Sequence, residues 1–367
     1  MILVYIFMET LLSNTAMKDN KLSRRTFVKA SSASLAALSL PMILSGRTNE
    51  SSAAASLPGP APAQPAPPDS ISNAWEAGSA DSFTRYYFDT LMVETRYMDA
   101  DLPSTKLDLF GQTFDTPIMT AALSHQNNRN VKGMVVYAQA AANCNAVHWM
   151  GMGEDQELEE IVATGAKTVK IVKPHENNDE VFRKIRHAES VGCFAVGMDI
   201  DHPFNGRGGY DVVYGLPMKP KSTEEMKSFV KATRLPFIVK GVLSVHDARR
   251  CMEAGVAGIV LSHHGGRVKY SIPPLMALEQ IADVVKGKMK IFVDCGIVSG
   301  MDAYKCLALG ADAVSVGRHL MPLISQGVEQ VEKRMKAMTA ELAGVMSATG
   351  VKSLKEMDPT VIHKTVL

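Results

Sequence analysis

Residues 257–267 read AGIVLSHHGGR, a short apolar run that ends in two histidines and two glycines. An apolar run of this length without alternation is typical of a strand that is buried on both faces. The preceding residues, 244–254, have helical spacing. A helix followed by a buried strand predicts one unit of an α/β fold with a parallel sheet.

The same kind of apolar run occurs eight times along the chain, with helical spacing between several of the runs, for example over residues 179–190 and 302–309. Eight such units predict a TIM (β/α)8 barrel, and a doubly wound sheet is the alternative. A further helical segment near residues 70–95 and a closing helix over 327–349 are also expected. The expected strands are residues 117–121, 146–150, 168–173, 194–199, 236–241, 257–262, 290–294 and 312–317.

The first residues resemble a targeting signal. Residues 23–29, SRRTFVK, precede a weakly hydrophobic stretch over 30–44 that is shorter than the ~20 apolar residues of a membrane span. They resemble a twin-arginine export signal, and a basic N-terminal helix is the alternative. We therefore expect a periplasmic or membrane-anchored protein that contacts the membrane only through this signal.

The predicted organisation follows from these patterns. Residues 46–70 are rich in Ser, Ala and Pro and predict a flexible linker. Met17 would be a better start than Met1, which predicts that residues 1–16 are not translated. The expected parts are a signal region at 1–45, the linker at 46–70, the barrel at 71–350 and a C-terminal tail at 351–367.

Composition narrows the class of partner. The formal net charge is +1, from 39 Lys and Arg against 38 Asp and Glu, so a nucleic-acid surface is not expected. The five cysteines show no zinc-binding spacing, so no metal is expected and the thiols are interpreted as small buried hydrophobes. A small molecule is the expected partner.

Polar side chains gather where the expected strands end. In a TIM barrel these ends and the loops after them form the active site. Charged and imidazole groups that converge on an otherwise apolar barrel predict a ligand site. The strand ends carry Asp199, Asp201 and His202, Lys240, Ser262, His263, His264 and Arg267, Asp294 and Gly296, and Gly317 and Arg318.

Three spaced motifs resemble those of one enzyme family. They are LPFIVKG at 235–241, SHHGGR at 262–267, and residues 294–318, which contain ALGADAV. In this order they resemble the FMN-dependent α-hydroxy-acid dehydrogenases, which include glycolate oxidase and lactate oxidase, and the resemblance covers most of residues 71–350. It implies an FMN cofactor, oxidation of a 2-hydroxy acid (lactate- or glycolate-like) to the 2-oxo acid, and a homo-oligomer, a tetramer as in relatives.

The resemblance also implies cofactor contacts. Gly296, Gly317 and Arg318 would hold the FMN phosphate, because backbone N–H groups and a guanidinium suit a dianion. The phosphate site of such barrels commonly follows strands seven and eight, which agrees with these positions. Asp294 would accept hydrogen bonds from the ribityl hydroxyls.

The remaining implied roles concern the flavin ring and the substrate. Lys240 would lie by the flavin N1 and C2 carbonyl, where a cation favours reduction, and Ser262 would hydrogen-bond the ring. His264 would be the catalytic base, since histidine ordinarily titrates near neutral pH. Asp201 would orient and stabilise its imidazolium, and Arg267 would bind the substrate carboxylate.

The sequence departs from the family in the substrate half of the site. Residues 74–79 lack a tyrosine, and Lys170 is expected where the family has a glutamine two residues before a second tyrosine. His263 stands where the family usually has Asn and is interpreted as structural. Val298 replaces a phosphate-binding arginine, and Arg207 would substitute for a second carboxylate-binding arginine only if its loop shifts. The alternatives are an FMN-binding barrel with another reaction, such as an isomerase, a degenerate binding protein, or an FMN-free barrel.

Overall fold

Eight parallel strands form the centre of the protein, for which a computed structural model describes residues 78–285 and 287–365. The predicted signal region and linker lie outside the described residues. Each strand overlaps one expected apolar run, so the strand prediction is confirmed. The strands are β4 (Ile118–Thr120), β5 (His148–Met150), β6 (Thr168–Val172), β7 (Ala195–Asp199), β10 (Phe237–Val242), β11 (Gly258–Leu261), β12 (Lys290–Val293) and β13 (Ala313–Val316).

The sheet closes on itself. Its strand order is β4-β13-β12-β11-β10-β7-β6-β5, and every pair within it is parallel. The two outer strands of this order, β4 and β5, are joined by backbone bonds: Thr120 N–H donates to Val147 O at 3.2 Å, and Gly151 N–H donates to Leu123 O at 2.7 Å. The predicted barrel is therefore confirmed over the doubly wound sheet.

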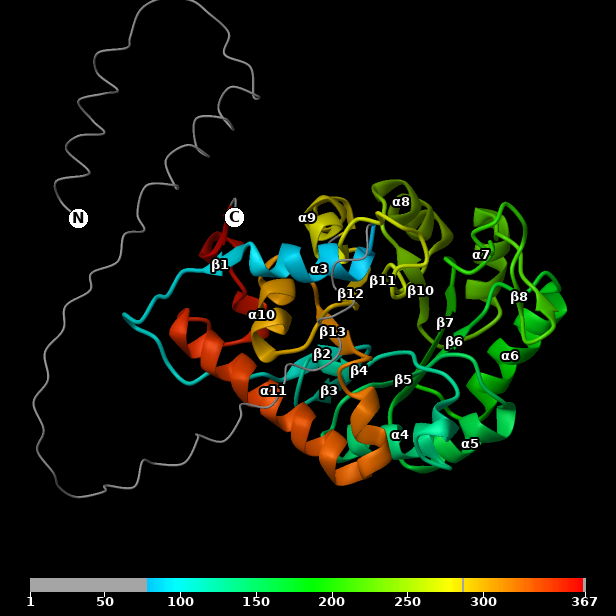
Figure 1. Cartoon of the computed structure of the whole chain (residues 1–367), viewed down its shortest axis with the longest axis horizontal. Coiled ribbons are helices and arrows are strands. Elements are labelled where there is room, and N and C mark those ends of the chain that lie inside the picture. The colour runs from blue at the N-terminus through cyan, green and yellow to red at the C-terminus, as the bar shows by residue number, and fades with distance from the viewer. Residues whose placement is uncertain (1–77, 286, 366–367) are drawn as a thin grey trace, which may run out of the picture. The chain divides into compact units, whose positions relative to one another are not determined.

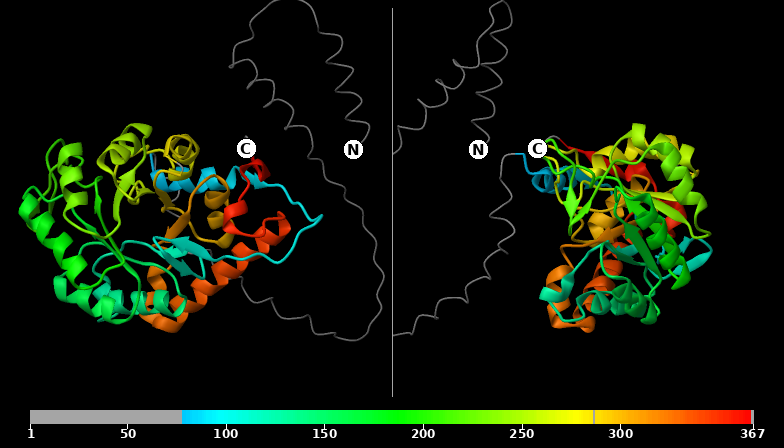
Figure 2. Two further views of the ribbon diagram at one scale, coloured as in Figure 1. Left: turned by 180° about the vertical axis from the view of Figure 1, so that it is seen from behind. Right: turned by 90° about the vertical axis from the view of Figure 1, so that its right-hand side faces the viewer.

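Helices cover the outside of the barrel. In Figure 1, α5 to α8 lie outside the strands β5, β6, β7 and β10, and the view from behind in Figure 2 shows the same arrangement. Polar caps set their ends: in α8, the Ser244 hydroxyl accepts from Asp247 N–H, and Gly255 ends the helix with φ 77°. The helices are α4 (Gly133–Asn143), α5 (Asp155–Ala163), α6 (Asn178–Ser190), α7 (Thr223–Lys231), α8 (Val245–Ala254), α9 (Pro274–Val285), α10 (Gly300–Ala308) and α11 (Val328–Ala348).

The interior of the barrel is filled at the end where the strands begin. The hairpin of β2 (Leu107–Leu109) and β3 (Gln112–Phe114) packs there, with Phe114 edge-on to Phe194 just before β7. The opposite, carboxyl end of the strands is left for a site. The interior cluster takes side chains from all eight strands or the residues beside them: Met119, Val147, Trp149, Val169, Ile171, Ala195, Ile238, Val260, Phe292 and Ala313.

Elements at both ends of the described chain complete the fold. Helix α3 (Ala80–Asp89) lies within the segment expected to be helical, and α11 confirms the closing helix. Strand β1 (Leu91–Val93) pairs antiparallel with β14 (Ile362–Lys364), so part of the expected C-terminal tail is ordered against the first strand. No helix of the described residues is long and apolar enough to cross a membrane.

Candidate active site

A cavity of about 520 Å³ opens at the carboxyl ends of the strands. This volume is in the range of small-molecule and cofactor sites. Six of the nine predicted site residues line it: Lys240, His264, Asp294, Gly296, Gly317 and Arg318. The other three, Ser262, Asp201 and Arg267, connect to it through hydrogen bonds. The expectation that site residues lie at the carboxyl ends of the barrel strands therefore identified residues that the fold does bring together.

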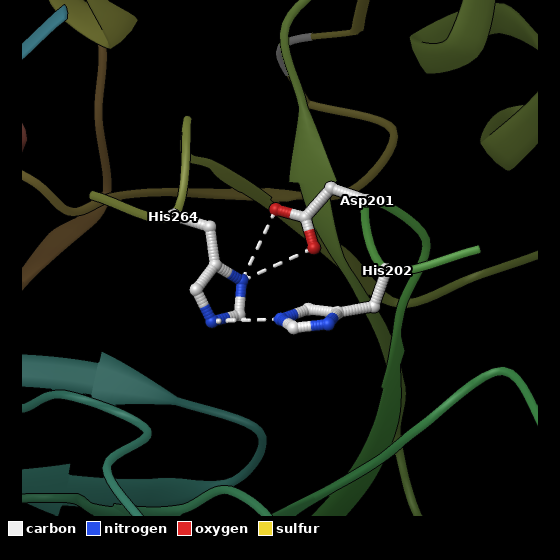
Figure 3. Close-up of side chains that lie close together, drawn as sticks. All are labelled: Asp201, His202 and His264. Carbon is white, nitrogen blue, oxygen red and sulfur yellow. Dashed lines mark hydrogen bonds and ion pairs between the residues drawn. The ribbon is translucent and has the colours of Figure 1, made fainter. Parts of the chain in front are cut away.

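His264, which lines this cavity, forms a pair with Asp201, and Figure 3 shows the two side chains. The imidazole Nδ1 of His264 lies 3.1 and 3.2 Å from the two carboxylate oxygens of Asp201. The backbone of His264 is left-handed, with φ 52°, and its N–H donates to Ser262 Oγ at 3.1 Å. Burial alone would raise the pKa of Asp201, but the hydrogen bond from His264 helps to hold that pKa below its usual value. The ionised carboxylate thus fixes the ring with its Nδ1 protonated.

A second imidazole lies against the first. His202 Nε2 is 3.3 Å from His264 Nε2, and the two rings are inclined at 72°. Arg267 contacts the same His202 Nε2 through Nη1 at 3.3 Å, while its Nη2 donates to Asp211 Oδ2 at 2.7 Å and to Phe204 O at 2.8 Å. Burial lowers the pKa of His202 to about 3, so this ring is neutral. Arg267 therefore reaches His264 through His202.

Buried charged side chains of alternating sign lie next to the His264–Asp201 pair. Lys240 Nζ is buried and lies 3.1 Å from Ser262 Oγ, 3.4 Å from Asp294 and 3.5 Å from Asp199. Lys173 Nζ contacts the other oxygen of Asp199 at 2.6 Å. Burial opposes the charge of Lys240, but Asp294 and Asp199 outweigh it and raise the lysine's pKa above its ordinary value. Burial would likewise raise the pKa of Asp199, yet Lys173 and Lys240 hold it well below the ordinary value.

Lys173 is a site residue that the sequence analysis missed, whereas Lys170 is not at the site. Val169 and Ile171 point into the barrel, so by alternation Lys173 points the same way and Lys170 points out. Lys170 Nζ donates to Gly151 O at 2.6 Å, and burial lowers its pKa to about 8. Strand alternation was the available signal, because Lys173 ends the expected run 168–173.

Helix α3 closes the site from a distant part of the sequence. Asp81 forms a bidentate ion pair with Arg318, whose Nη2 lies 2.6 Å from Asp81 Oδ1. His263 is buried and bonds Thr84 Oγ1 at 2.8 Å, while its Nδ1 accepts from Gly266 N–H at 3.0 Å. These contacts match the structural interpretation of His263. Arg207, by contrast, is exposed in its loop.

The cavity fits a cofactor that has a phosphate group and a ring on which negative charge develops. Its buried cation is Lys240, and its more exposed cation is Arg318, whose side chain is 57% exposed. Gly296 and Gly317 also line the cavity with Arg318, and because they have no side chain their backbone is accessible to a ligand. The Arg318 guanidinium is already paired with the Asp81 carboxylate. A bound phosphate would therefore either share the guanidinium with Asp81 or displace Asp81 from it. Ionic and backbone donors of this kind suit the phosphate of FMN.

Gly296 is constrained by space as well as by conformation. Its φ is 74°, and a Cβ added there would lie 2.6 Å from Thr84 Cγ2. Gly296→Ala is expected to lower the free energy of unfolding by about 2–4 kcal/mol, from strain plus displacement of α3. Gly255→Ala is the matched control, because Gly255 also has a positive φ, 77°, but nothing within 4 Å. Calorimetric melting of both variants separates the two contributions, and equal losses would rule out the contact with α3.

Comparison with known proteins places the chain in a family. It matches the FMN-dependent dehydrogenase family over residues 69–228 and 218–364. It is 29% identical to 4-hydroxymandelate oxidase of Amycolatopsis orientalis, over 68% of this chain and 80% of that protein, and 26% identical to glycolate oxidase of Spinacia oleracea, over 79% and 90%. A mandelate oxidase variant solved with an FMN adduct superimposes with a TM-score of 0.73 at 28% identity, over 82% of this chain and 95% of that one. The chain belongs to the FMN-dependent dehydrogenase family.

Proposed function

We propose that this protein oxidises a 2-hydroxy acid to the corresponding 2-oxo acid with FMN as the electron acceptor. The observation that carries the proposal is the His264–Asp201 pair, which opens on the same cavity as the Lys240 ammonium. A base and a buried cation in one cavity suit removal of a proton together with transfer of two electrons to a flavin. Relatives named as mandelate, glycolate and 2-hydroxyacid oxidases support the substrate class.

His264 would hold the proton that the substrate loses. Asp201 keeps the proton of Nδ1 in place, so the lone pair of Nε2 is the basic atom. The same carboxylate stabilises the imidazolium that forms when Nε2 is protonated. This arrangement serves whether the proton leaves the substrate carbon or its hydroxyl. When bound, FMN supplies the two-electron acceptor for the reaction.

The other predicted residues would bind and orient. Among the described residues, Nη1 of Arg267 bonds only the neutral His202, whereas Nη2 is held by Asp211. Nη1 is therefore the atom that can turn to a substrate carboxylate. Lys240 would lie against the flavin ring with Ser262 beside it. The remaining cofactor contacts would come from Asp294, Gly296, Gly317 and Arg318, all of which line the cavity.

The test is anaerobic reduction of the purified protein. We expect a yellow protein whose flavin absorbance bleaches with at least one acid of a panel containing both enantiomers of mandelate, 4-hydroxymandelate and lactate, together with glycolate. A yellow protein that no acid bleaches would favour an isomerase or a binding protein. A colourless protein that does not take up added FMN would overturn the cofactor assignment itself.

We also propose export by a twin-arginine route and a homotetrameric state. The export proposal is supported by the stretch SRRTFVK at residues 23–29, and the tetramer by resemblance to the family. Replacing both arginines, Arg24→Lys with Arg25→Lys, is expected to leave the folded, FMN-loaded protein in the cytoplasm. Cell fractionation measures this, and undiminished export of the double variant would contradict it. Light scattering on the purified protein tests the tetramer.

A further inference from the structure

The Asp201, His202 and His264 cluster has the composition of a transition-metal site. One ligand atom from each residue, two imidazole nitrogens and a carboxylate oxygen, lies within 4.8 Å of the others. Figure 3 shows one ring nitrogen of His264 facing Asp201 and the other facing His202. Asp201 and His202 follow strand β7 and His264 follows β11, so the barrel, and not a local sequence spacing, brings these groups together.

Hydrogen-bond partners fix where the lone pairs point. An ionised carboxylate only accepts, so Asp201 requires a proton on His264 Nδ1 and leaves the lone pair of the neutral ring on Nε2. A guanidinium only donates, so Arg267 Nη1 requires the lone pair of His202 on Nε2. Two lone pairs therefore face each other across the 3.3 Å between the Nε2 atoms. With both rings neutral this contact is repulsive, and it becomes attractive when a proton or a metal cation lies between the two nitrogens.

The separation suits a tetrahedral metal ion. Zinc–nitrogen bonds of about 2.0–2.1 Å at a tetrahedral angle place two ligand nitrogens roughly 3.3–3.4 Å apart. The surroundings also resemble those of bound metals, because ligating histidines usually present their other ring nitrogen to a carboxylate. His264 Nδ1 does so to Asp201, and His202 Nδ1, which has no hydrogen-bond partner in the described part of the chain, lies 3.6 Å from Asp211 Oδ2.

The positive charge of Arg267 disfavours binding of a cation between His202 and His264. Its Nη1 lies 3.3 Å from His202 Nε2 and would have to give up that contact. Its two stronger bonds use Nη2 and would remain, and they keep the guanidinium on Asp211. The carboxylates of Asp201 and Asp211 offset the added charge on either side of the histidine pair.

We propose that His202 and His264 form an inhibitory site for a divalent transition ion such as Zn²⁺, with Asp201 holding the other ring nitrogen of His264. Two imidazole ligands favour ions of this class over Mg²⁺ or Ca²⁺, which prefer oxygen. A bound ion takes the Nε2 lone pair of His264, so it excludes the substrate proton from that atom. The inhibition rests on the proposed role of His264 as base, whereas the binding does not.

The binding test is calorimetry of Zn²⁺ with tag-free, FMN-loaded protein in the absence of substrate. We expect one site per chain, and His202→Asn is expected to weaken it by about 10–100-fold or more. His187→Asn is the matched control, because His187 is also a histidine beside two carboxylates, Glu159 at 3.1 Å and Asp155 at 3.8 Å, but on the outer helices. Bound Co²⁺ should give visible absorption bands in the wild type and the His187 variant only.

Three outcomes would overturn the proposal. One is the absence of a Zn²⁺ site in the wild type, another is equal affinity in the His202 variant, and the third is a site lost with His187 instead. Where a substrate bleaches the flavin, Zn²⁺ should raise its apparent KM in the wild type and act more weakly in His202→Asn. Zn²⁺ binding without any turnover would leave the metal site standing and count against the proposed oxidation alone.

Discussion

His264→Asn is expected to retain FMN and to lower kcat by about 10²- to 10⁴-fold, which is the usual contribution of a general base. Asparagine is the appropriate replacement because position 264 has φ 52°, a left-handed conformation that asparagine adopts more readily than most residues. Its amide can still bond Asp201 but cannot take a proton. Rapid-mixing measurement of flavin reduction, beside the FMN content of the purified variant, gives both quantities.

The neighbouring histidine provides the control. His263 is buried against Thr84 and Gly266 and does not line the cavity. We expect His263→Asn to lower the melting temperature, because it loses a buried hydrogen bond worth about 1 kcal/mol, but to reduce FMN at the wild-type rate. If the two variants lose activity equally, the base assignment is wrong and position 264 matters only through the shape of the loop.

The barrel could be predicted because its signal is local. Each buried strand is encoded by a run of consecutive apolar residues, and all eight runs were identified from the sequence. The pairing of β1 with β14 could not be predicted in this way, since it joins Leu91 to Lys364 through backbone bonds that leave no pattern in either segment. The hairpin of β2 and β3 that fills the barrel from below is likewise visible only once the strands are closed around it.

The site residues likewise fall into those that a local sequence signal predicts and those that only the fold brings together. The expectation that site residues lie at the carboxyl ends of barrel strands selects Lys240, His264 and Asp294, because each lies within two residues of the end of an apolar run. It does not say that Asp81 of α3 pairs with Arg318, a contact between segments 237 positions apart. Lys173 was missed for a different reason. Matching short motifs by resemblance placed Lys170 at the site, and only the inward direction of Val169 and Ile171 shows that Lys173 belongs there.

Lys240→Met is expected to damage both the fold and flavin reduction. The change removes the cation between Asp294 and Asp199, and Asp199 keeps Lys173 whereas Asp294 loses its only ion pair in the described residues. Breaking a buried pair costs about 3–5 kcal/mol of unfolding free energy. Loss of a positive charge facing the reduced flavin should slow reduction by about 10²- to 10³-fold and lower the flavin's reduction potential. Chemical denaturation, rapid mixing and potentiometry measure the three effects.

Two further variants separate the electrostatic role of Lys240 from its contribution to packing. Lys240→Arg keeps the charge and should recover part of the reduction rate, although its guanidinium needs more room beside Ser262. Lys170→Met removes another buried lysine, one that points away from the cavity and bonds Gly151 O. It should lower stability and leave the reduction rate and potential unchanged, because no charge facing the flavin is lost. If Lys170→Met and Lys240→Met slow reduction alike, the loss comes from the fold, and Lys240 does not act on the flavin.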